Sequence, residues 1–181
     1  MPHKYSTALS HLILAGTGIY CLSRYHESTY KLPSGTYSII ITNSLLGVWK
    51  WGNPDYGHNV NKLYNFTSFL QMITSLPFIV TQVWFNLGYN QHEVAIAHNG
   101  ASVLSLLLYL VDKSKEDVVD ASIAINVISL GVISLLYENY YGVAASISYF
   151  FNHFILREGL FDIDLPVIDL YNYGLCFFCY F

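Results

Sequence analysis

Three histidines lie inside apolar segments of the sequence, where ionisable side chains are rare and often functional. They are His11, His98 and His153. Imidazole titrates near neutral pH and ligates metals, so such residues can move protons or hold a cation. At a helical rise of about 1.5 Å per residue, His98 lies ~18 Å in depth from the other two, so only His11 and His153 share a level. We therefore predict no metal site and no cofactor.

Other polar side chains recur at helical spacing along the same apolar segments. Within a membrane such residues are expected to face neighbouring helices. They predict a polar seam inside a helix bundle, which consists of His11, Gln71, His98, Ser102, Asn126, Tyr149, Asn152 and His153. These side chains either hydrogen-bond helices together or line a path for a ligand, proton or ion. The interior is otherwise predicted to hold almost no carboxylates, which argues against ion-coupled pumping.

Cysteine spacing offers a second kind of chemistry. Cys176 and Cys179 form a CxxC pair that is a candidate redox site. Membrane thiol oxidoreductases generally need a second pair to pass electrons on, and only Cys21 remains. Packing of the two thiols among apolar side chains is therefore the favoured interpretation. His92-Glu93 with His98 departs from the HExxH zinc motif by two residues and predicts no metalloprotease.

Composition defines the surroundings of these residues. Of the 181 residues, 54% are hydrophobic and only 11% are charged, against about 25% in soluble domains. Because so few charges cannot cover a water-soluble surface, we predict an integral membrane protein whose partner is the lipid bilayer. The net charge of −4 and the absence of any run of basic residues exclude nucleic acid as an expected partner.

The apolar segments predict an all-α, polytopic membrane helical bundle with a single domain, because no loop is long enough to fold alone. Six helices are expected near residues 7–23, 36–51, 66–89, 94–111, 121–137 and 142–157. A further apolar segment, 166–181, either crosses the membrane as a seventh helix or lies in its interface. The basic residues gather in loops on one side, which predicts a cytoplasmic N-terminus and leaves the sequon at Asn65 unmodified.

Pro77 interrupts the third segment. Proline has no backbone N–H, so the carbonyl of Ile73 loses its helical partner and a kink is expected there. The first three and last three of six helices would be inverted relative to each other, as in many transporter repeats. No convincing residue match between the halves supports such a repeat.

Three functions stay open. Missing catalytic motifs and minimal loops favour a non-enzymatic accessory or assembly subunit, packed against a membrane partner or a second copy. The alternative is a carrier or channel for a small molecule or protons, using the polar seam. The third is a lipid-modifying enzyme centred on His11 and His153. A seam that encloses a cavity would favour the second or third function, whereas a seam packed shut would favour the first.

Overall fold

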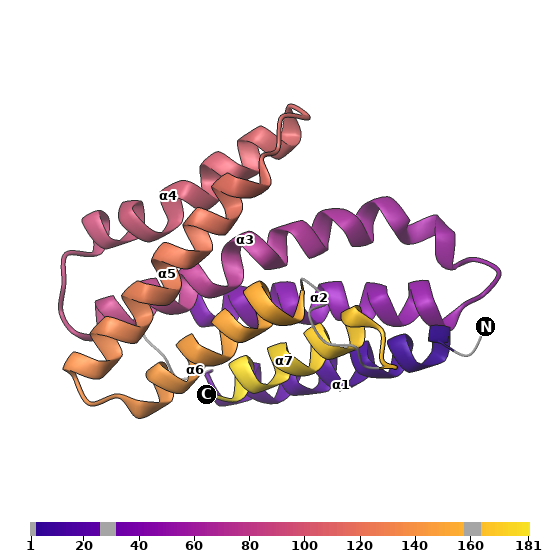
Figure 1. Ribbon diagram of the computed structural model, residues 1–181, viewed down its shortest axis with the longest axis horizontal. Helices are drawn as coiled ribbons and strands as arrows, with labels where there is room; N and C mark the ends of the chain where they lie inside the picture. Colours follow the sequence, from indigo (N-terminus) through magenta and orange to yellow (C-terminus); the bar gives the residue numbers. More distant parts are fainter. Residues whose placement is uncertain (1–2, 26–31, 158–163) are drawn as a thin grey trace.

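A computed structural model describes residues 3–25, 32–157 and 164–181. Within these ranges the chain forms helices and no strand (Figure 1). The helices are α1 (His3–Arg24), α2 (Leu32–Gly52), α3 (Asn61–Asn86), α4 (Gln91–Leu110), α5 (Glu116–Leu136), α6 (Tyr140–Phe151) and α7 (Val167–Tyr180), with a 3₁₀ turn, η1 (Gly57–Val60), and a π-helical turn, η2 (Asn152–Leu156). The charged loop residues Lys31, Glu158 and Asp162 lie outside the described residues.

Local signals explain several helix ends. The side chains of Asn90 and Asn139 accept backbone hydrogen bonds from His92 and Gly142, which caps the first turns of α4 and α6. Gly88, at φ +82°, makes the left-handed turn between α3 and α4. The connections 87–90 and 137–139 are therefore tight, and each joins two antiparallel helices.

Each of the seven predicted segments overlaps one of these helices. The all-helical fold is confirmed, and three regions, Gly57–Asn86, Gln91–Leu110 and Glu116–Leu136, are long and apolar enough to cross a membrane. The other helices are not candidate membrane spans, for two reasons. α1 and α2 have the length but not the hydropathy, while α6 and α7, with 12 and 14 residues, are short. Three candidate spans thus indicate membrane association.

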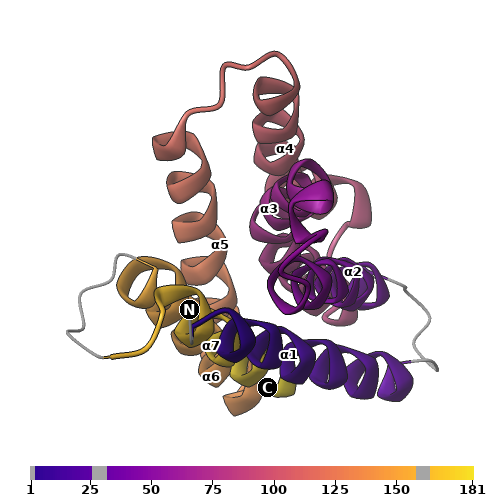
Figure 2. The ribbon, with the colours of Figure 1, turned by 90° about the vertical axis from the view of Figure 1, so that its right-hand side faces the viewer.

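Six of the helices form a ring. α1 packs on α2, α2 on α3, α3 on α5, α5 on α6, α6 on α7, and α7 returns to α1. Figure 2 looks along the helices from the end at which α1 begins. α4 contacts α3 and α5 and lies outside this ring. Its outward side chains, among them Ile96, Val103 and Leu107, are exposed and apolar, as expected of a face that meets lipid.

Successive helices alternate in direction (Figure 1). α1, α3, α5 and α7 run one way, and α2, α4 and α6 run the other way, so the two chain ends lie at opposite ends of the bundle. The N-terminal end of the bundle holds the start of α1, η1, the 111–115 turn and the start of α7. The opposite end holds the 87–90 and 137–139 turns and the C-terminus.

Candidate functional site: a cavity among the helices

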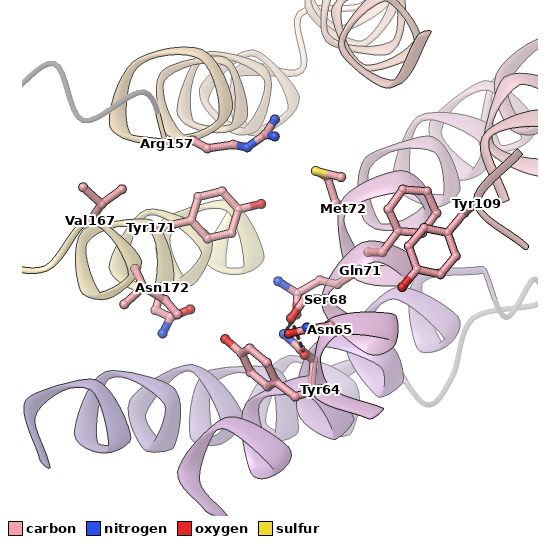
Figure 3. Close-up of a pocket in the computed structure, with 13 residues that line it drawn as sticks. Tyr64, Asn65, Ser68, Gln71, Met72, Tyr109, Arg157, Val167, Tyr171 and Asn172 are labelled. Carbon is pink, nitrogen blue, oxygen red and sulfur yellow. Dashed lines mark hydrogen bonds between the residues drawn. The ribbon is translucent and has the colours of Figure 1, made fainter. Parts of the chain in front are cut away.

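A cavity of about 730 Å³ lies between α2, α3 and α4 on one side and α7 and Arg157, the residue after η2, on the other. Figure 3 shows Tyr64 and Met72 of α3, Tyr171 of α7 and Arg157 extending into the same space. Its wall is made of Asn43, Tyr64, Asn65, Ser68, Phe69, Gln71, Met72, Tyr109, Arg157, Val167, Ile168, Tyr171 and Asn172. Because Asn65 and Val167 are exposed, the cavity reaches the protein surface. Of the predicted seam, Gln71 lies in the wall of this cavity.

Amides and hydroxyls on α2 and α3 form one wall of the cavity. Asn43 donates its side-chain amide to the carbonyl oxygen of Gln71 at 3.0 Å. Its own oxygen accepts from Thr67 at 2.8 Å and from Ser68 at 2.9 Å. Each side chain here is fixed by another, so the wall is ordered before any ligand arrives. The Gln71 amide nitrogen still carries two hydrogens that this network does not use.

His11 supports this wall from α1. Its Nε2 lies 3.1 Å from the Tyr64 hydroxyl, and the two rings meet edge to face. The ring lies against Gly47 of α2, where a Cβ atom would come within 2.5 Å of it. Gly47 thus gives the imidazole its space, and His11 in turn positions Tyr64 at the cavity. His11 acts through Tyr64 and does not itself line the cavity.

Arg157, which follows η2, is the cation in the cavity wall, and it is already paired. It contacts Glu116 of α5 and lies 3.3 Å from Asp120. His153 Nε2 donates to the same Asp120 oxygen at 2.8 Å. Two carboxylates therefore surround one guanidinium, so this group offers no net positive charge to a ligand. The predicted fifth segment starts at residue 121, but α5 begins at Glu116 and carries Asp120 one turn into the helix.

A buried carboxylate joins α7 to α1 beside the cavity. Asp169 is fully buried, and its two oxygens accept from the hydroxyls of Ser6 at 2.7 Å and Ser10 at 3.1 Å. Asn172, which lines the cavity, donates to Ser10 at 3.0 Å. Asp169 lies in the first turn of α7, where the helix dipole favours an anion. It is the exception to an interior predicted to hold almost no carboxylates.

His98 belongs to a separate cluster between α3, α4 and α5. Asn126 donates to the carbonyl of Ser122, so its oxygen faces His98 and accepts from Nδ1 at 3.0 Å. Ser129 links the cluster to Trp84 of α3, whose indole N–H donates to it at 3.0 Å. None of these residues lines the cavity. The cluster holds α4 against the ring.

Ser102 of α4 has a specific structural partner. Its hydroxyl donates to the carbonyl of Ile73 at 2.6 Å. This is the carbonyl that Pro77 deprives of its helical hydrogen bond. A side chain from the neighbouring helix therefore satisfies the backbone group that the proline frees.

The structure places all eight residues of the predicted seam in the interior but brings only Gln71 into the cavity wall. His11 meets Tyr64 and His153 meets Asp120, so the two histidines have different partners. Asn152 is buried against Gly174 of α7. Sequence reasoning did not assign the other wall residues to a site, among them Asn43, Tyr64, Arg157, Tyr171 and Asn172. A signal existed for Asn43 and Asn172, which are amides inside apolar segments.

The cysteines lie away from the cavity. Cys176 and Cys179 are free thiols on α7, and Cys179 is buried. Cys21 of α1 donates its S–H to the backbone carbonyl of Cys179 at 3.2 Å. Cys21 and Cys179 therefore lie at the same end of the α1–α7 interface. The three thiols pack the α1–α7 interface near its C-terminal end.

No known protein family, no curated protein and no solved structure matches this chain. Its class therefore follows from the fold and the cavity. The described residues form an all-helical protein with three helices apolar enough to cross a membrane and a cavity whose mostly apolar wall carries amide and hydroxyl groups.

Proposed function

We propose that this is a multi-pass membrane protein of seven crossings that binds a small, uncharged, hydroxyl-bearing molecule in the cavity between α2, α3 and α7. The observation that carries the proposal is the cavity itself. Its volume of about 730 Å³ falls within the range of ~300–1,000 Å³ that holds small ligands. Packing between helices alone would not require such a space.

The chemistry of the wall supports an uncharged ligand. Asn43, Asn65, Gln71 and Asn172 contribute amides, while Tyr64, Tyr109, Tyr171 and Ser68 contribute hydroxyls. Amides and hydroxyls both donate and accept hydrogen bonds without carrying charge. The one guanidinium in the wall is balanced by Glu116 and Asp120. A charged ligand would lose its hydration without gaining an opposite charge, whereas hydroxyl groups could pair with amide and hydroxyl groups of the wall, such as the Gln71 amide nitrogen.

This proposal places ligand binding ahead of the other functions considered. An accessory or assembly subunit needs outward contact faces but no interior cavity. A lipid-modifying enzyme centred on His11 and His153 would need the two imidazoles at one reacting bond, whereas each pairs with a different residue. The exposed apolar faces of α4 and α5 support contact with lipid or with a partner helix, and binding by the cavity is compatible with either.

Ligand binding is tested by thermal unfolding in a polyoxyethylene detergent, with myo-inositol as an uncharged polyol and with phosphate and choline as charged probes. A ligand at ten times its Kd stabilises the folded state by about 1.4 kcal/mol, which raises Tm by several degrees for a chain of this size. We expect myo-inositol alone to raise Tm. Gln71→Leu should abolish this rise, while Gln91→Leu, at the exposed start of α4, should preserve it.

Two outcomes would contradict the proposal. A rise in Tm with phosphate or choline but not with myo-inositol would mean that the cavity selects charge. A rise that persists in Gln71→Leu would place the ligand elsewhere. The seven crossings have their own test: tags at the two termini should be reached from opposite sides of the membrane, with the N-terminal tag cytoplasmic. Glycosylation at Asn65 would contradict this orientation.

A further inference from the structure

A second cavity, of about 290 Å³, lies in the same ring at its opposite end. It is lined from α2, α3, α5, α6 and α7, with Tyr37, Val83, Leu130, Ala145 and Phe178 among its wall residues. All of its wall residues carry uncharged side chains, so it too is suited to an uncharged molecule. We call the 730 Å³ cavity the inner cavity and the 290 Å³ cavity the outer cavity.

A thin apolar layer separates the two cavities. Along α2 it extends from Tyr37 to Asn43, and along α7 from Asn172 to Phe178. Six residues of helix correspond to about 9 Å, roughly a third of the hydrocarbon thickness of a bilayer. In this layer α2, α3 and α7 each contribute one aliphatic side chain with 0% exposure: Ile40, Leu76 and Leu175.

Tyr149 of α6 reaches from the wall of one cavity to the wall of the other. Its hydroxyl donates to the backbone carbonyl of Met72, which lines the inner cavity, at 3.3 Å. Its ring packs edge to face on Phe178, which lines the outer cavity, with centroids 4.8 Å apart. Tyr149 is 1% exposed. Tyr149 therefore links one wall residue of each cavity across the layer that Ile40, Leu76 and Leu175 also fill.

The helices around this layer contain two interruptions. Pro77 lies within the layer on α3, where it removes one helical hydrogen bond. On α6 the π-helical turn η2 begins at Asn152, three residues after Tyr149. Isolated π-turns are rare and occur frequently at functional sites. Both positions lower the cost of bending a helix at the level where the two cavities would have to join.

The ring consists of two three-helix units in the same orientation. α1, α2 and α3 pack in order, as do α5, α6 and α7, and the units meet through the equivalent contacts α3 with α5 and α7 with α1. α1 and α5 run in the same direction (Figure 1). These units differ from the two halves considered in the sequence, because α4 belongs to neither unit; α4 itself runs opposite to α1. Both cavities lie between the units, where transporters built of parallel repeats bind their substrates.

From these observations we propose that the two cavities are the ends of one path, along which the protein carries a small uncharged polyol across the membrane, with Tyr149 as the gate. This inference rests on the proposed function, because it takes the same class of ligand. It adds movement of that ligand from the inner to the outer cavity by motion of one three-helix unit against the other.

The test uses the full chain reconstituted in liposomes and radiolabelled myo-inositol as the probe. We expect the wild type to take up myo-inositol several times faster than protein-free liposomes. Tyr149→Phe keeps the aromatic ring but removes the hydrogen bond to the Met72 carbonyl. The rate of myo-inositol uptake should then change about fivefold, because one net hydrogen bond shifts an equilibrium by about that factor. Tyr137→Phe is the matched control, since it also removes one tyrosine hydroxyl. Tyr137 is exposed, and among the described residues its hydroxyl contacts that of Tyr89 alone.

The outcomes separate this inference from the proposed function. Wild-type uptake equal to that of protein-free liposomes would overturn the path, while a rise in Tm with myo-inositol would leave ligand binding intact. Uptake that is unchanged in Tyr149→Phe and also in Tyr149→Ala would overturn the role of Tyr149 as the gate. If Tyr137→Phe changes uptake as much as Tyr149→Phe does, the effect comes from a general loss of stability, and this outcome too would overturn the role of Tyr149 as the gate. Loss of both uptake and the Tm rise would remove both proposals.

Discussion

Gly47→Ala should destabilise the protein through a contact between two helices. Gly47 of α2 lies against the imidazole of His11 on α1, and a Cβ atom there would come within 2.5 Å of three ring atoms. The ring cannot retreat freely, because it is buried and its Nε2 lies within hydrogen-bonding distance of the Tyr64 hydroxyl. Either the two helices move apart or His11 leaves Tyr64.

The size of the effect follows from three contributions. Forcing an extra methyl group into a packed interior costs about 1–3 kcal/mol. Losing the His11–Tyr64 hydrogen bond costs about 1 kcal/mol more. Replacing glycine by alanine in a helix returns about 1 kcal/mol. We therefore expect a net loss of about 1–3 kcal/mol, and each 1 kcal/mol lowers Tm by about 2–4 °C for a chain of this length.

The assay is thermal unfolding in detergent, with Gly16→Ala as the matched control. Gly16 lies in α1, and a Cβ atom there would meet nothing within 4 Å. That substitution should leave Tm unchanged or raise it slightly through helix propensity. The two variants add the same methyl group to neighbouring helices, so their difference measures the contact with His11.

A double-mutant cycle sharpens the test. In the His11→Ala background the ring is gone, and Gly47→Ala should cost nothing or stabilise the helix. The coupling energy between the two positions should therefore exceed about 1 kcal/mol. Equal Tm values for Gly47→Ala and Gly16→Ala, or a cost of Gly47→Ala that survives in the His11→Ala background, would refute the packing of His11 against α2.

Two further substitutions test buried polar contacts by the same assay. Asp169→Asn replaces one of the two carboxylate oxygens that accept from Ser6 and Ser10, so it should cost about 1–3 kcal/mol. The control Asp164→Asn, at an exposed position, should cost less than about 0.5 kcal/mol. Equal Tm values for the two variants would contradict the buried pairing. Ser102→Ala should cost about 1–3 kcal/mol because it leaves the carbonyl freed by Pro77 unsatisfied. In the Pro77→Ala background an N–H is restored, so a cost of Ser102→Ala that remains undiminished there would refute this explanation.

Hydropathy and helical periodicity are enough to predict the helices, because both follow from the local sequence. Each predicted segment overlaps a helix, and every seam residue is buried. What the periodicity cannot give is the partner of each inward face. His98 and His153 look alike in sequence, but His98 pairs with Asn126 on the outside of the ring and His153 with Asp120 beside the cavity.

The cavity is not predictable from sequence because its wall comes from segments far apart in the chain. Tyr64 and Tyr171 are ordinary tyrosines among sixteen, and nothing local distinguishes them. In the sequence Arg157 is the last residue of the predicted helix 142–157 and one of the basic residues on the predicted cytoplasmic side. Its role in the wall depends on η2, which places the guanidinium beside Asp120 of α5. The way in which the helices of the ring pack together, and not residue type, decides which polar groups line the cavity.

The position of α4 follows from the proposed topology. A unit of three crossings ends on the side of the membrane opposite to its start. A second unit that followed directly would therefore have to be inverted. One additional crossing restores the starting side and lets α5, α6 and α7 repeat the orientation of α1, α2 and α3. A connecting helix needs no place in the ring, and α4 lies outside it. Two of its buried polar groups, His98 and Ser102, bind neighbouring helices, and α4 reaches the cavity only through Tyr109 near its end. Replacing them should therefore weaken the fold without changing which ligand the cavity selects.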